Sequence, residues 1–285
     1  MTENSIHPDT VLGYTHLTVS GLTRSLDFYQ QSLGFKLHRR EGDTAYLGAG
    51  RADLLRLTEL PGARPTSHTT GLYHFAILTP SRPELAQVLR RIAETRAPVQ
   101  GFADHLVSEA IYLPDPDGNG IEIYRDRPRS QWDYPNGQLK MATDPLDIED
   151  LLAELQDETE PWPGLHPDTV LGHIHLHVGQ IAQAETFYRD VLGFDLMVRY
   201  GPTASFLSAG GYHHHIGVNT WAGVGASPPP PDAAGLRWFT IRLPSGEALN
   251  RVADRVRAAG IPLEEQEAGL FLRDPFENGM LLTTS

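Results

Sequence analysis

The strongest constraint on this chain is an internal repeat. The segment His7–Gly13 (HPDTVLG) recurs without a change as His166–Gly172, which begins 159 residues later. Seven identical residues in register are not a chance match, and a repeat of this length signals a duplicated structural unit. The correspondence continues at Leu17/Leu176, Val19/Val178, Phe28-Tyr29/Phe187-Tyr188, Leu33–Phe35/Leu192–Phe194, Asp115-Pro116/Asp274-Pro275 and Asn119-Gly120/Asn278-Gly279. The chain is therefore a tandem duplication.

Each half divides again into two similar units. A unit begins with an alternating strand pattern, continues into an amphipathic helix and ends in further strand-like segments. In the first unit the strand covers Thr15–Val19 and the helix Ser25–Ser32, which stops at Gly34. In the second unit the strand covers Tyr73–Leu78, the helix about 83–95, and later strands Ile111-Tyr112 and Ile121–Tyr124. We therefore expect an α+β protein of four βαβββ units, here called units one to four.

The expected organisation places two units on each side of a connection. The first half covers residues 8–127 and the second half residues 167–285. Residues 128–165 form the connection, which is polar and rich in proline but contains the apolar spacing of one short helix.

Composition narrows the function. The chain has 23 Lys and Arg against 36 Asp and Glu, a net charge of -13, so nucleic acid and anionic membranes would be repelled. It contains no cysteine, which excludes disulfides, thiolate metal sites and cysteine nucleophiles. Residues 1–15 show no signal-peptide pattern, and no apolar run reaches the roughly 18 residues of a membrane span. We expect a cytoplasmic protein in which any metal is held by His, Asp or Glu.

Three motifs carry a resemblance to a known family. They are Arg24–Tyr29 (RSLDFY), Leu33–Phe35 (LGF) and, most specifically, Asp115–Tyr124 (DPDGNGIEIY). Together they resemble the vicinal oxygen chelate superfamily of glyoxalases, bleomycin-resistance proteins and extradiol dioxygenases. Four units in one chain most resemble the catechol 2,3-dioxygenases. The resemblance implies two cupped mixed sheets, each formed by a pair of units, around a divalent metal.

The resemblance also implies positions for the metal ligands, on the first strand of each unit and on a last strand. In units two and three these positions hold His74, Glu122 and His173, whereas in units one and four they hold Tyr14, Trp238 and Leu281. We therefore expect the functional cup to pair unit two with unit three, and units one and four to form a second cup as scaffold. Two imidazoles and one carboxylate suit non-haem Fe(II) with open positions for substrate and oxygen. Mn(II), Zn(II) and Ni(II) are the alternatives.

Further active-site residues follow from the resemblance. In the segment Tyr212–Val218 (YHHHIGV), His214 matches the family's acid/base histidine. His105 matches a histidine that contacts substrate or oxygen, and Tyr112 a tyrosine that hydrogen-bonds the substrate. We expect residues 213–215 to lie in a strand, with His214 facing the metal and its two neighbours facing away.

Other readings of these residues remain open. His16, His175 and His177 alternate on first strands and could face the same interior. His16 with His74 and Glu122 would make a rival site within the first half. The run of histidines 213–215 could be a surface cluster, and Glu122 could merely end an edge strand.

The sequence thus favours an Fe(II)-dependent extradiol dioxygenase that inserts O2 next to the diol of a catechol-type ring. Its partners would be a small aromatic diol and O2, not nucleic acid or membrane. One alternative is a glyoxalase-like metal-dependent lyase, which would present a second metal carboxylate where unit three instead offers His214. Another is a non-enzymatic, resistance-type protein that sequesters a ligand. The ring substituents, the native metal and the oligomeric state, a homo-oligomer included, stay open.

Overall fold

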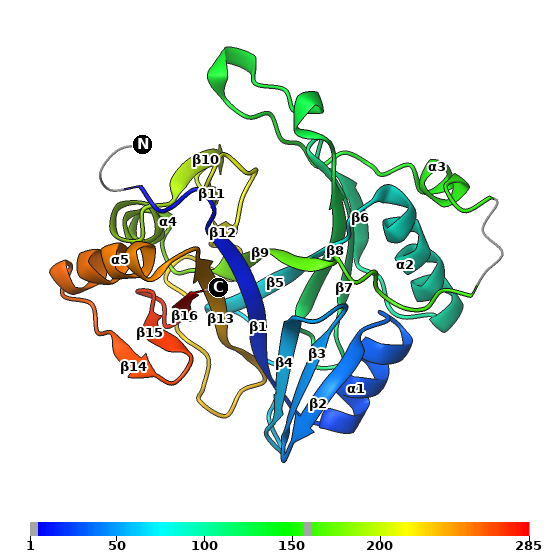
Figure 1. The fold of residues 1–285 in the computed structure, drawn as a ribbon, viewed down its shortest axis with the longest axis horizontal. Coiled ribbons are helices and arrows are strands. Elements are labelled where there is room, and N and C mark those ends of the chain that lie inside the picture. The colour runs from blue at the N-terminus through cyan, green and yellow to red at the C-terminus, as the bar shows by residue number, and fades with distance from the viewer. Residues whose placement is uncertain (1–4, 157–160, 285) are drawn as a thin grey trace.

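The computed structural model describes residues 5–156 and 161–284. Residues 157–160 of the expected connection and residue 285 of the expected second half lie outside the described residues. Four βαβββ units follow one another along the chain (Figure 1).

The first two units are regular. Unit one contains β1 (Val11–Val19), α1 (Leu22–Gln31), β2 (Lys36–Glu41), β3 (Thr44–Gly48) and β4 (Asp53–Glu59). Unit two contains β5 (Gly71–Leu78), α2 (Arg82–Thr95), β6 (Gly101–Asp104), β7 (Ser108–Pro114) and β8 (Gly120–Asp126). Both helices are longer than the sequence pattern indicated, and α2 begins at the Ser81 cap, whose side chain accepts from the Glu84 amide.

The last two units repeat the order. Unit three contains β9 (Val170–His177), α4 (Ile181–Glu185) continued by the π-helical η3 (Thr186–Val191), β10 (Asp195–Tyr200), β11 (Ala204–Ser208) and β12 (Ile216–Asn219). Unit four contains β13 (Gly235–Leu243), α5 (Gly246–Ala258), β14 (Glu264–Gln266), β15 (Gly269–Arg273) and β16 (Gly279–Thr284). The connection between the halves carries the 3-10 turns η1 (Arg129–Gln131) and η2 (Pro135–Gly137) and the short helix α3 (Ile148–Ala153).

The units pair across the halves. One eight-stranded sheet has the order β14-β15-β16-β13-β1-β4-β3-β2 and joins units one and four, which we call the outer cup. The other has the order β10-β11-β12-β9-β5-β8-β7-β6 and joins units two and three, which we call the inner cup. The central pairs, β1 with β13 and β5 with β9, are antiparallel. The predicted pairing of unit two with unit three is therefore confirmed, and the architecture is two curled mixed sheets.

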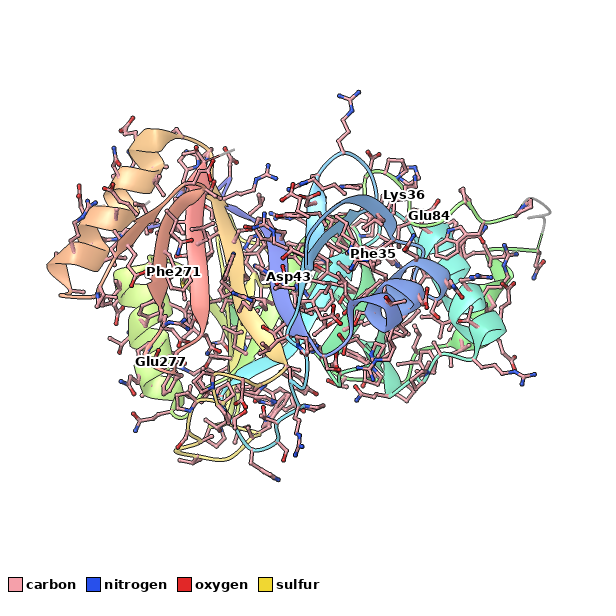
Figure 2. The ribbon with its side chains drawn as sticks, turned by 90° about the horizontal axis from the view of Figure 1, so that it is seen from below. Phe35, Lys36, Asp43, Glu84, Phe271 and Glu277 are labelled. Atoms are coloured by element: carbon pink, nitrogen blue, oxygen red, sulfur yellow. The ribbon has the colours of Figure 1, made fainter. Side chains whose placement is uncertain are left out.

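The helices pack within a half, unlike the sheets. The Arg91 Nε of α2 donates to the Gln31 carbonyl at the end of α1 (2.7 Å), and the Arg255 Nε of α5 donates to the Val191 carbonyl of η3 (2.9 Å). In Figure 2, Phe271 of the second half lies in one lobe and Phe35 of the first half in the other. Each half is thus tied together by helices, and the two halves are tied to each other by strands.

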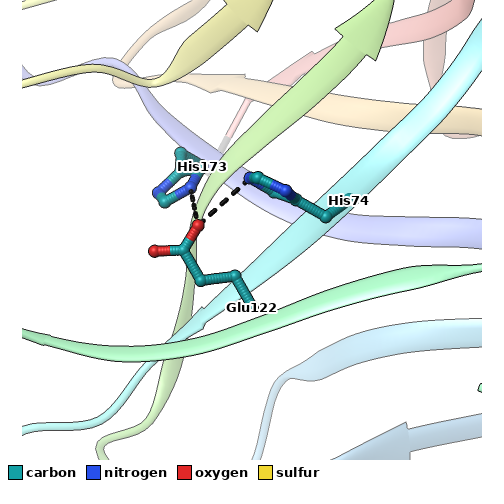
Figure 3. A group of neighbouring side chains, drawn as sticks. All are labelled: His74, Glu122 and His173. Carbon is teal, nitrogen blue, oxygen red and sulfur yellow. Dashed lines mark hydrogen bonds and ion pairs between the residues drawn. The ribbon is translucent and has the colours of Figure 1, made fainter. Parts of the chain in front are cut away.

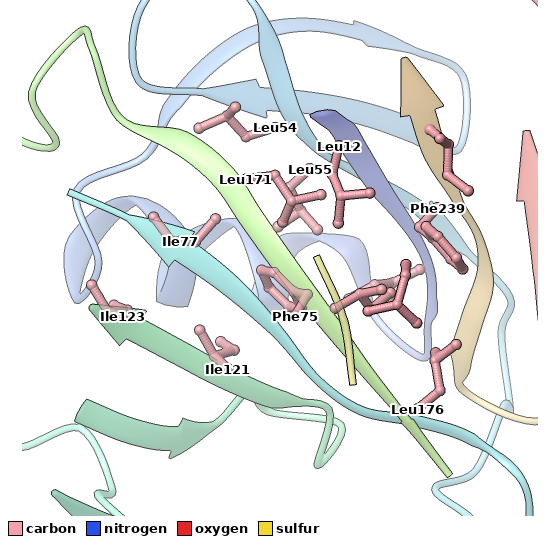
Figure 4. Packing of buried hydrophobic residues seen from close by; sticks show 14 of the residues in the cluster. Leu12, Leu54, Leu55, Phe75, Ile77, Ile121, Ile123, Leu171, Leu176 and Phe239 are labelled. Atoms are coloured by element: carbon pink, nitrogen blue, oxygen red, sulfur yellow. The ribbon is translucent and has the colours of Figure 1, made fainter. Parts of the chain in front are cut away.

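Alternation along the central strands separates a core face from a cup face. The apolar members of both sheets pack in one core, as Figure 4 shows for Phe75, Ile121 and Leu176 among others. The residues beside them, such as His74 and Glu122, point to the opposite face. The apolar core therefore fixes the register that presents polar side chains inside the cup.

The turn before β8 is held by the Asp115–Tyr124 motif. Asp115 accepts bonds from the Asn119 amide (2.9 Å) and from the hydroxyl of Tyr29 (3.0 Å), which joins the turn to α1. A side chain at Gly120 would lie 2.0 Å from the carbonyl oxygen of Tyr73, so only glycine lets β8 approach β5 this closely. The motif thus brings β8, and with it Glu122, against the strand that carries His74.

The segment that follows β8 packs beside the inner cup. Trp132 and Leu139 are buried with Val107, and Met141, Val198 and Tyr212 pack against them. In the described part of the chain, no helix has the length and apolar character needed to cross a membrane.

Candidate functional site

Three predicted ligands meet on the concave face of the inner cup. His74 lies on β5, Glu122 on β8 and His173 on β9, and all three are buried. Each offers one ligand atom within 4.8 Å of the others. The Glu122 Oε2 lies 3.0 Å from His173 Nε2 and 3.1 Å from His74 Nε2 (Figure 3). In the described ranges, this is the one cluster of three or more side chains arranged to hold a metal ion.

Strand register explains the convergence. Ala76 is paired with Glu122 across the parallel β5–β8 ladder and with His173 across the antiparallel β5–β9 ladder. His74 precedes Ala76 by two residues and so shares its face. Because the Ala76 side chain is small, it leaves space between Glu122 and His173. The side chains of His74, Glu122 and His173 meet in this space.

The chemistry of the three groups fits a divalent cation. Burial alone would raise the pKa of Glu122, but the charge and hydrogen bond of His173, together with the nearby His74, hold it well below its usual value. Burial lowers the pKa of His173 to about 4, although Glu122 acts in the opposite direction. An ionised carboxylate and neutral imidazoles are the forms that bind metals.

Two ring nitrogens of the cluster, His173 Nδ1 and His74 Nε2, are left without a hydrogen bond. His74 Nε2 is buried and has no hydrogen-bond partner in the structure, despite its closeness to Glu122. His173 Nε2–H donates to Glu122, and a bound cation would replace that proton, since metal binding releases protons. A buried acceptor without a donor is costly unless something binds it. The residues therefore fit a metal.

A fourth protein ligand is missing at the equivalent place in unit three. Glu122 pairs with Ala76, which lies two residues after His74. In unit three the corresponding pair is Gly217 with His175, which lies two residues after His173. A Cβ on Gly217 would lie 2.8 Å from Cγ and 2.9 Å from Cδ2 of His175, so His175 fills the space of a side chain. Gly217 was not predicted as a site residue from the sequence. The result is a set of three donors on one side of the cup.

The histidine run differs from its prediction. Residues 213–215 precede β12, in a loop that begins with Gly210 and Gly211 at positive φ (60° and 68°), so the predicted strand and its alternation are wrong. All three histidines are buried, so the surface-cluster reading is wrong as well. The His214 ring nevertheless lies against His173, with centroids 4.0 Å apart.

A hydrogen-bonded chain fixes the orientation of His214. His213 contacts Asp126 Oδ1 through Nε2 (2.9 Å) and His214 Nδ1 through its own Nδ1 (2.7 Å). Because a carboxylate accepts, a neutral His213 carries its proton on Nε2, and His214 donates from Nδ1. Nε2 of His214 is then the unprotonated nitrogen. Burial and the neighbouring histidines lower the pKa of His214 well below its ordinary value, so it is neutral.

Two tyrosines that were not predicted from the sequence as site residues extend this chain of hydrogen bonds. Tyr212 donates to Asp126 (3.1 Å), and its hydroxyl lies 2.7 Å from that of Tyr124. Glu122, Tyr124 and Asp126 alternate along β8 and therefore share the cup face. This alternation with Glu122 could have identified Tyr124 and Asp126 from the sequence as residues on the cup face.

His105 and Tyr112 form the opposite wall. His105 Nδ1–H donates to the Ala142 carbonyl (2.6 Å), so Nε2 accepts from the Tyr112 hydroxyl (2.6 Å). Tyr112 is directly opposite Glu122 on neighbouring strands. Burial, with help from Glu122, raises the pKa of Tyr112 well above 10, which keeps the phenol protonated.

The other three candidate histidines lie on different sheets: His16 is in the outer cup, and His175 and His177 are in the inner cup. His16 lies on β1 in the outer cup, where its Nε2 is 2.8 Å from Thr58 Oγ1 and its ring packs against Trp238. The rival site with His74 and Glu122 is therefore wrong. His175 stays inside the inner cup, 5.0 Å from the His74 ring, whereas His177 bonds Asn219 (2.7 Å). Glu122 lies on an interior strand, which removes the edge-strand reading.

A cavity of about 470 Å³ opens beside the three donors. Its wall includes His74, Glu122, His105, Tyr112 and His214. The volume lies within the range of roughly 300–1,000 Å³ typical of small-molecule sites.

Comparison with known proteins agrees with this arrangement. Residues 11–123 and 170–279 match the Glyoxalase/Bleomycin resistance protein/Dioxygenase superfamily. A catechol-2,3-dioxygenase of Bacillus subtilis (strain 168) is 50% identical over 276 residues, covering 95% of this chain and 96% of that protein.

Two solved structures share the fold. A putative dioxygenase from Bacillus subtilis has a TM-score of 0.62 at 15% identity, covering 96% of this chain and 85% of that one. Glyoxalase I from Zea mays has a TM-score of 0.59 at 16% identity, with coverage of 97% and 92%.

Proposed function

Because the chain belongs to the glyoxalase/bleomycin resistance protein/dioxygenase superfamily, we propose that it is an Fe(II)-dependent extradiol dioxygenase that cleaves a catechol-type ring beside the diol. The observation that carries this proposal is the buried His74–Glu122–His173 set with Gly217 in the place of a fourth ligand. The 50% identical relative named catechol-2,3-dioxygenase supports it. The proposed reaction joins both atoms of O2 to the substrate and breaks the carbon–carbon bond next to the two hydroxyls.

The metal centre would be held by His74, Glu122 and His173. A cation held by these three donors would have room for further ligands, and it would activate the diol and O2. Mn(II) would be a workable substitute, because it accepts the same donor types.

The chain's own residues would bind and orient the diol. Tyr112 lies on the strand next to Glu122, and because its own proton is donated to His105, its hydroxyl oxygen can accept a hydrogen bond from a catechol hydroxyl. His105 holds that hydroxyl from behind and is itself fixed by the Ala142 carbonyl. These bonds fix the direction of the Tyr112 hydroxyl before substrate arrives.

His214 is the proposed acid/base residue. Its Nε2 is unprotonated in the arrangement fixed by His213 and Asp126, so it can take a proton from the second catechol hydroxyl and return it later. Proton transfer by a positioned side chain contributes about 10²–10⁴-fold in rate.

A glyoxalase-like lyase fits less well. We expected such an enzyme to present a second metal carboxylate in unit three, and Gly217 has no side chain to offer. The likeness to glyoxalase I from Zea mays concerns the fold. A protein that only sequesters ligands would have no need for three buried donors beside its cavity.

The decisive experiment compares two activities under one loading protocol. Metal-free protein is loaded with Fe(II), Mn(II), Zn(II) or Ni(II) without oxygen, and then given catechol and O2, or the hemithioacetal of methylglyoxal and glutathione. We expect O2 uptake and a yellow ring-fission product with Fe(II), both lost in Glu122→Gln. Lyase activity without O2 uptake would replace the proposed function, and absence of both activities with every metal would contradict it.

A further inference from the structure

We propose that the outer cup is a second binding site, which takes a small aromatic carboxylate at Arg56. The inference goes beyond the proposed function, because it concerns the sheet formed by units one and four and requires no metal. It comes from a comparison of equivalent positions in the two cups.

An arginine in the outer cup takes the place of Gly217 in the inner cup. Gly217 pairs with His175 across the parallel β12–β9 ladder, and Arg56 pairs with His16 across the parallel β4–β1 ladder. His16 and His175 are equivalent in the internal repeat, 159 residues apart. Because the guanidinium of arginine keeps its proton in proteins, this position of the outer cup carries a permanent positive charge.

Two tyrosine rings hold this cation. The Arg56 Cζ lies over the rings of Tyr14 and Tyr46, 4.5 and 4.6 Å from their centroids. Such contacts fix a guanidinium but give its N–H groups no oxygen acceptor. Glu41 is bound elsewhere, because it accepts from the Tyr46 hydroxyl (3.0 Å) and from Arg39 (3.0 Å). In the described part of the chain, Arg56 therefore has no ion-pair partner.

The outer cup also contains buried donors without acceptors. The Nε atoms of Arg56 and of Arg242, whose side chain lies across Gly13 on β1, are buried and make no hydrogen bond to a described residue. A guanidinium nitrogen only donates, so the partner that fits it is an acceptor. The unpartnered His74 Nε2 of the inner cup is the opposite case, since it fits a cation. Because unpaired buried donors are costly, the outer cup favours an anion.

The local charge of this cup favours an anion as well. Arg237, at a bulge of β13, is exposed, and its Cζ lies 5.7 Å from the Trp238 ring. Burial lowers the pKa of His16 to about 2, and the charges of Arg237 and Arg56 add to this effect, so both cations lie near one ring. The chain as a whole has a net charge of -13, so a small anion is attracted to this cup against the general repulsion of the molecule.

The order of side chains across the sheet selects an aromatic acid. His16 pairs with Arg56 on one neighbouring strand and with Trp238 on the other, so Arg56 and Trp238 flank it, about 10 Å apart at the backbone. Arg56, Trp238 and Tyr14 are all partly exposed. A molecule lying over His16 can therefore direct a carboxylate to the guanidinium, whose planar fork it matches, and pack a ring against Trp238.

The test compares three small probes with the metal-free protein. Benzoate and benzamide share one ring and differ in charge, whereas cyclohexanecarboxylate keeps the charge and lacks the aromatic ring. Binding is measured by isothermal titration calorimetry. We expect benzoate to bind about 10-fold or more tightly than benzamide, because a hydrogen bond to a charged group is lost in the amide. It should bind about 3-fold more tightly than cyclohexanecarboxylate, because of the aromatic contact.

Charge variants locate the site. Arg56→Gln should lower the affinity for benzoate by about 10-fold or more and leave that for benzamide unchanged. Arg237→Gln should lower it by about 3-fold, because an exposed charge contributes less. Arg251→Gln, on α5 where Arg251 pairs with Glu247, removes the same charge elsewhere and should keep the wild-type affinity. Thermal unfolding shows whether each variant is folded; Arg237 makes no hydrogen bond to a described residue, so its variant decides if Arg56→Gln does not fold.

The contradicting results are specific. Equal affinity for benzoate and benzamide, or no binding of benzoate at millimolar concentration, would overturn the inference. Binding that neither Arg56→Gln nor Arg237→Gln weakens would place benzoate elsewhere, such as in the inner-cup cavity, and would overturn it too. Because these measurements use no metal and no O2, their outcome is independent of whether the inner cup cleaves a catechol.

Discussion

Replacing Gly217 with alanine should lower the free energy of unfolding by about 1–3 kcal/mol, the usual cost of overpacking a tight site. The added Cβ would lie 2.8 Å from Cγ and 2.9 Å from Cδ2 of His175, distances that real contacts do not show. These atoms are at the base of the ring, so a rotation of the ring alone does not remove the clash. Tyr73 and Trp221 contact the same ring at centroid distances of 5.1 and 5.4 Å and limit its retreat.

The assay is urea unfolding of the metal-free protein, followed by tryptophan fluorescence and by circular dichroism to check that one transition is seen. Gly101→Ala is the matched control, because a Cβ there meets nothing within 4 Å and its backbone angle is ordinary. We expect the control to stay within about 0.5 kcal/mol of the wild type. If Gly217→Ala were as stable as Gly101→Ala, our account of why unit three carries no fourth ligand would be refuted.

Three other predictions concern the two cups. Glu122→Gln should lose bound metal, measured by elemental analysis after Fe(II) loading, because two neutral imidazoles hold a divalent ion poorly. Glu247→Gln on the surface is the control and should keep the metal. His214→Phe should keep metal and diol binding but lose about 10²–10⁴-fold in turnover, because it removes the acid/base residue. Burial, with Arg237 and Arg56 nearby, lowers the pKa of His16 from 6.5 to about 2, so below pH 6.5 the unfolded chain binds a proton that the folded protein does not. The free energy of unfolding should therefore fall as the pH drops below 6.5, by about 1.4 kcal/mol per pH unit from this residue. His16→Asn should remove this contribution to the pH dependence, measured by urea unfolding at several pH values.

The contradicting outcomes are distinct. Full metal content in Glu122→Gln would show that the carboxylate is not a ligand. Normal turnover in His214→Phe would remove its proposed role, and loss of metal there would instead make it structural. An unchanged pH slope in His16→Asn would mean that His16 takes up its proton in the folded protein as readily as in the unfolded chain.

The ligand positions were predicted from the family resemblance, and the three side chains meet in the structure because strand register is encoded locally. Apolar neighbours such as Phe75 and Ile123 point into the core, so alternation along the strand directs the side chains of His74 and Glu122 to the cup face. The pairing of units two and three followed from which units carry ligand-type residues. The four βαβββ units followed from the duplicated pattern, and the two cupped sheets were implied by the resemblance.

The histidine loop was not predictable in the same way. Gly210 and Gly211 redirect the chain before β12, and the path of such a loop depends on what it packs against. Here that is Trp132, whose ring lies 5.6 Å from His213 and which comes from the connection between the halves. A contact between segments so far apart leaves no periodic trace in the sequence.

The nested pairing of units gives the two halves equal shares of each sheet. Each half contributes four strands to each eight-stranded sheet, so the molecule has the layout of a dimer whose subunits are fused in one chain. A first half released from this fusion and dimerised through β5 would bring two copies each of His74 and Glu122 into one cup, a symmetric set of four donors. Unit three carries His173 but has Gly217 in place of the carboxylate, so one of those four positions is empty. The two halves therefore contribute unequally to the inner cup: the first half supplies two donors and the second half one, with the His175 ring beside Gly217.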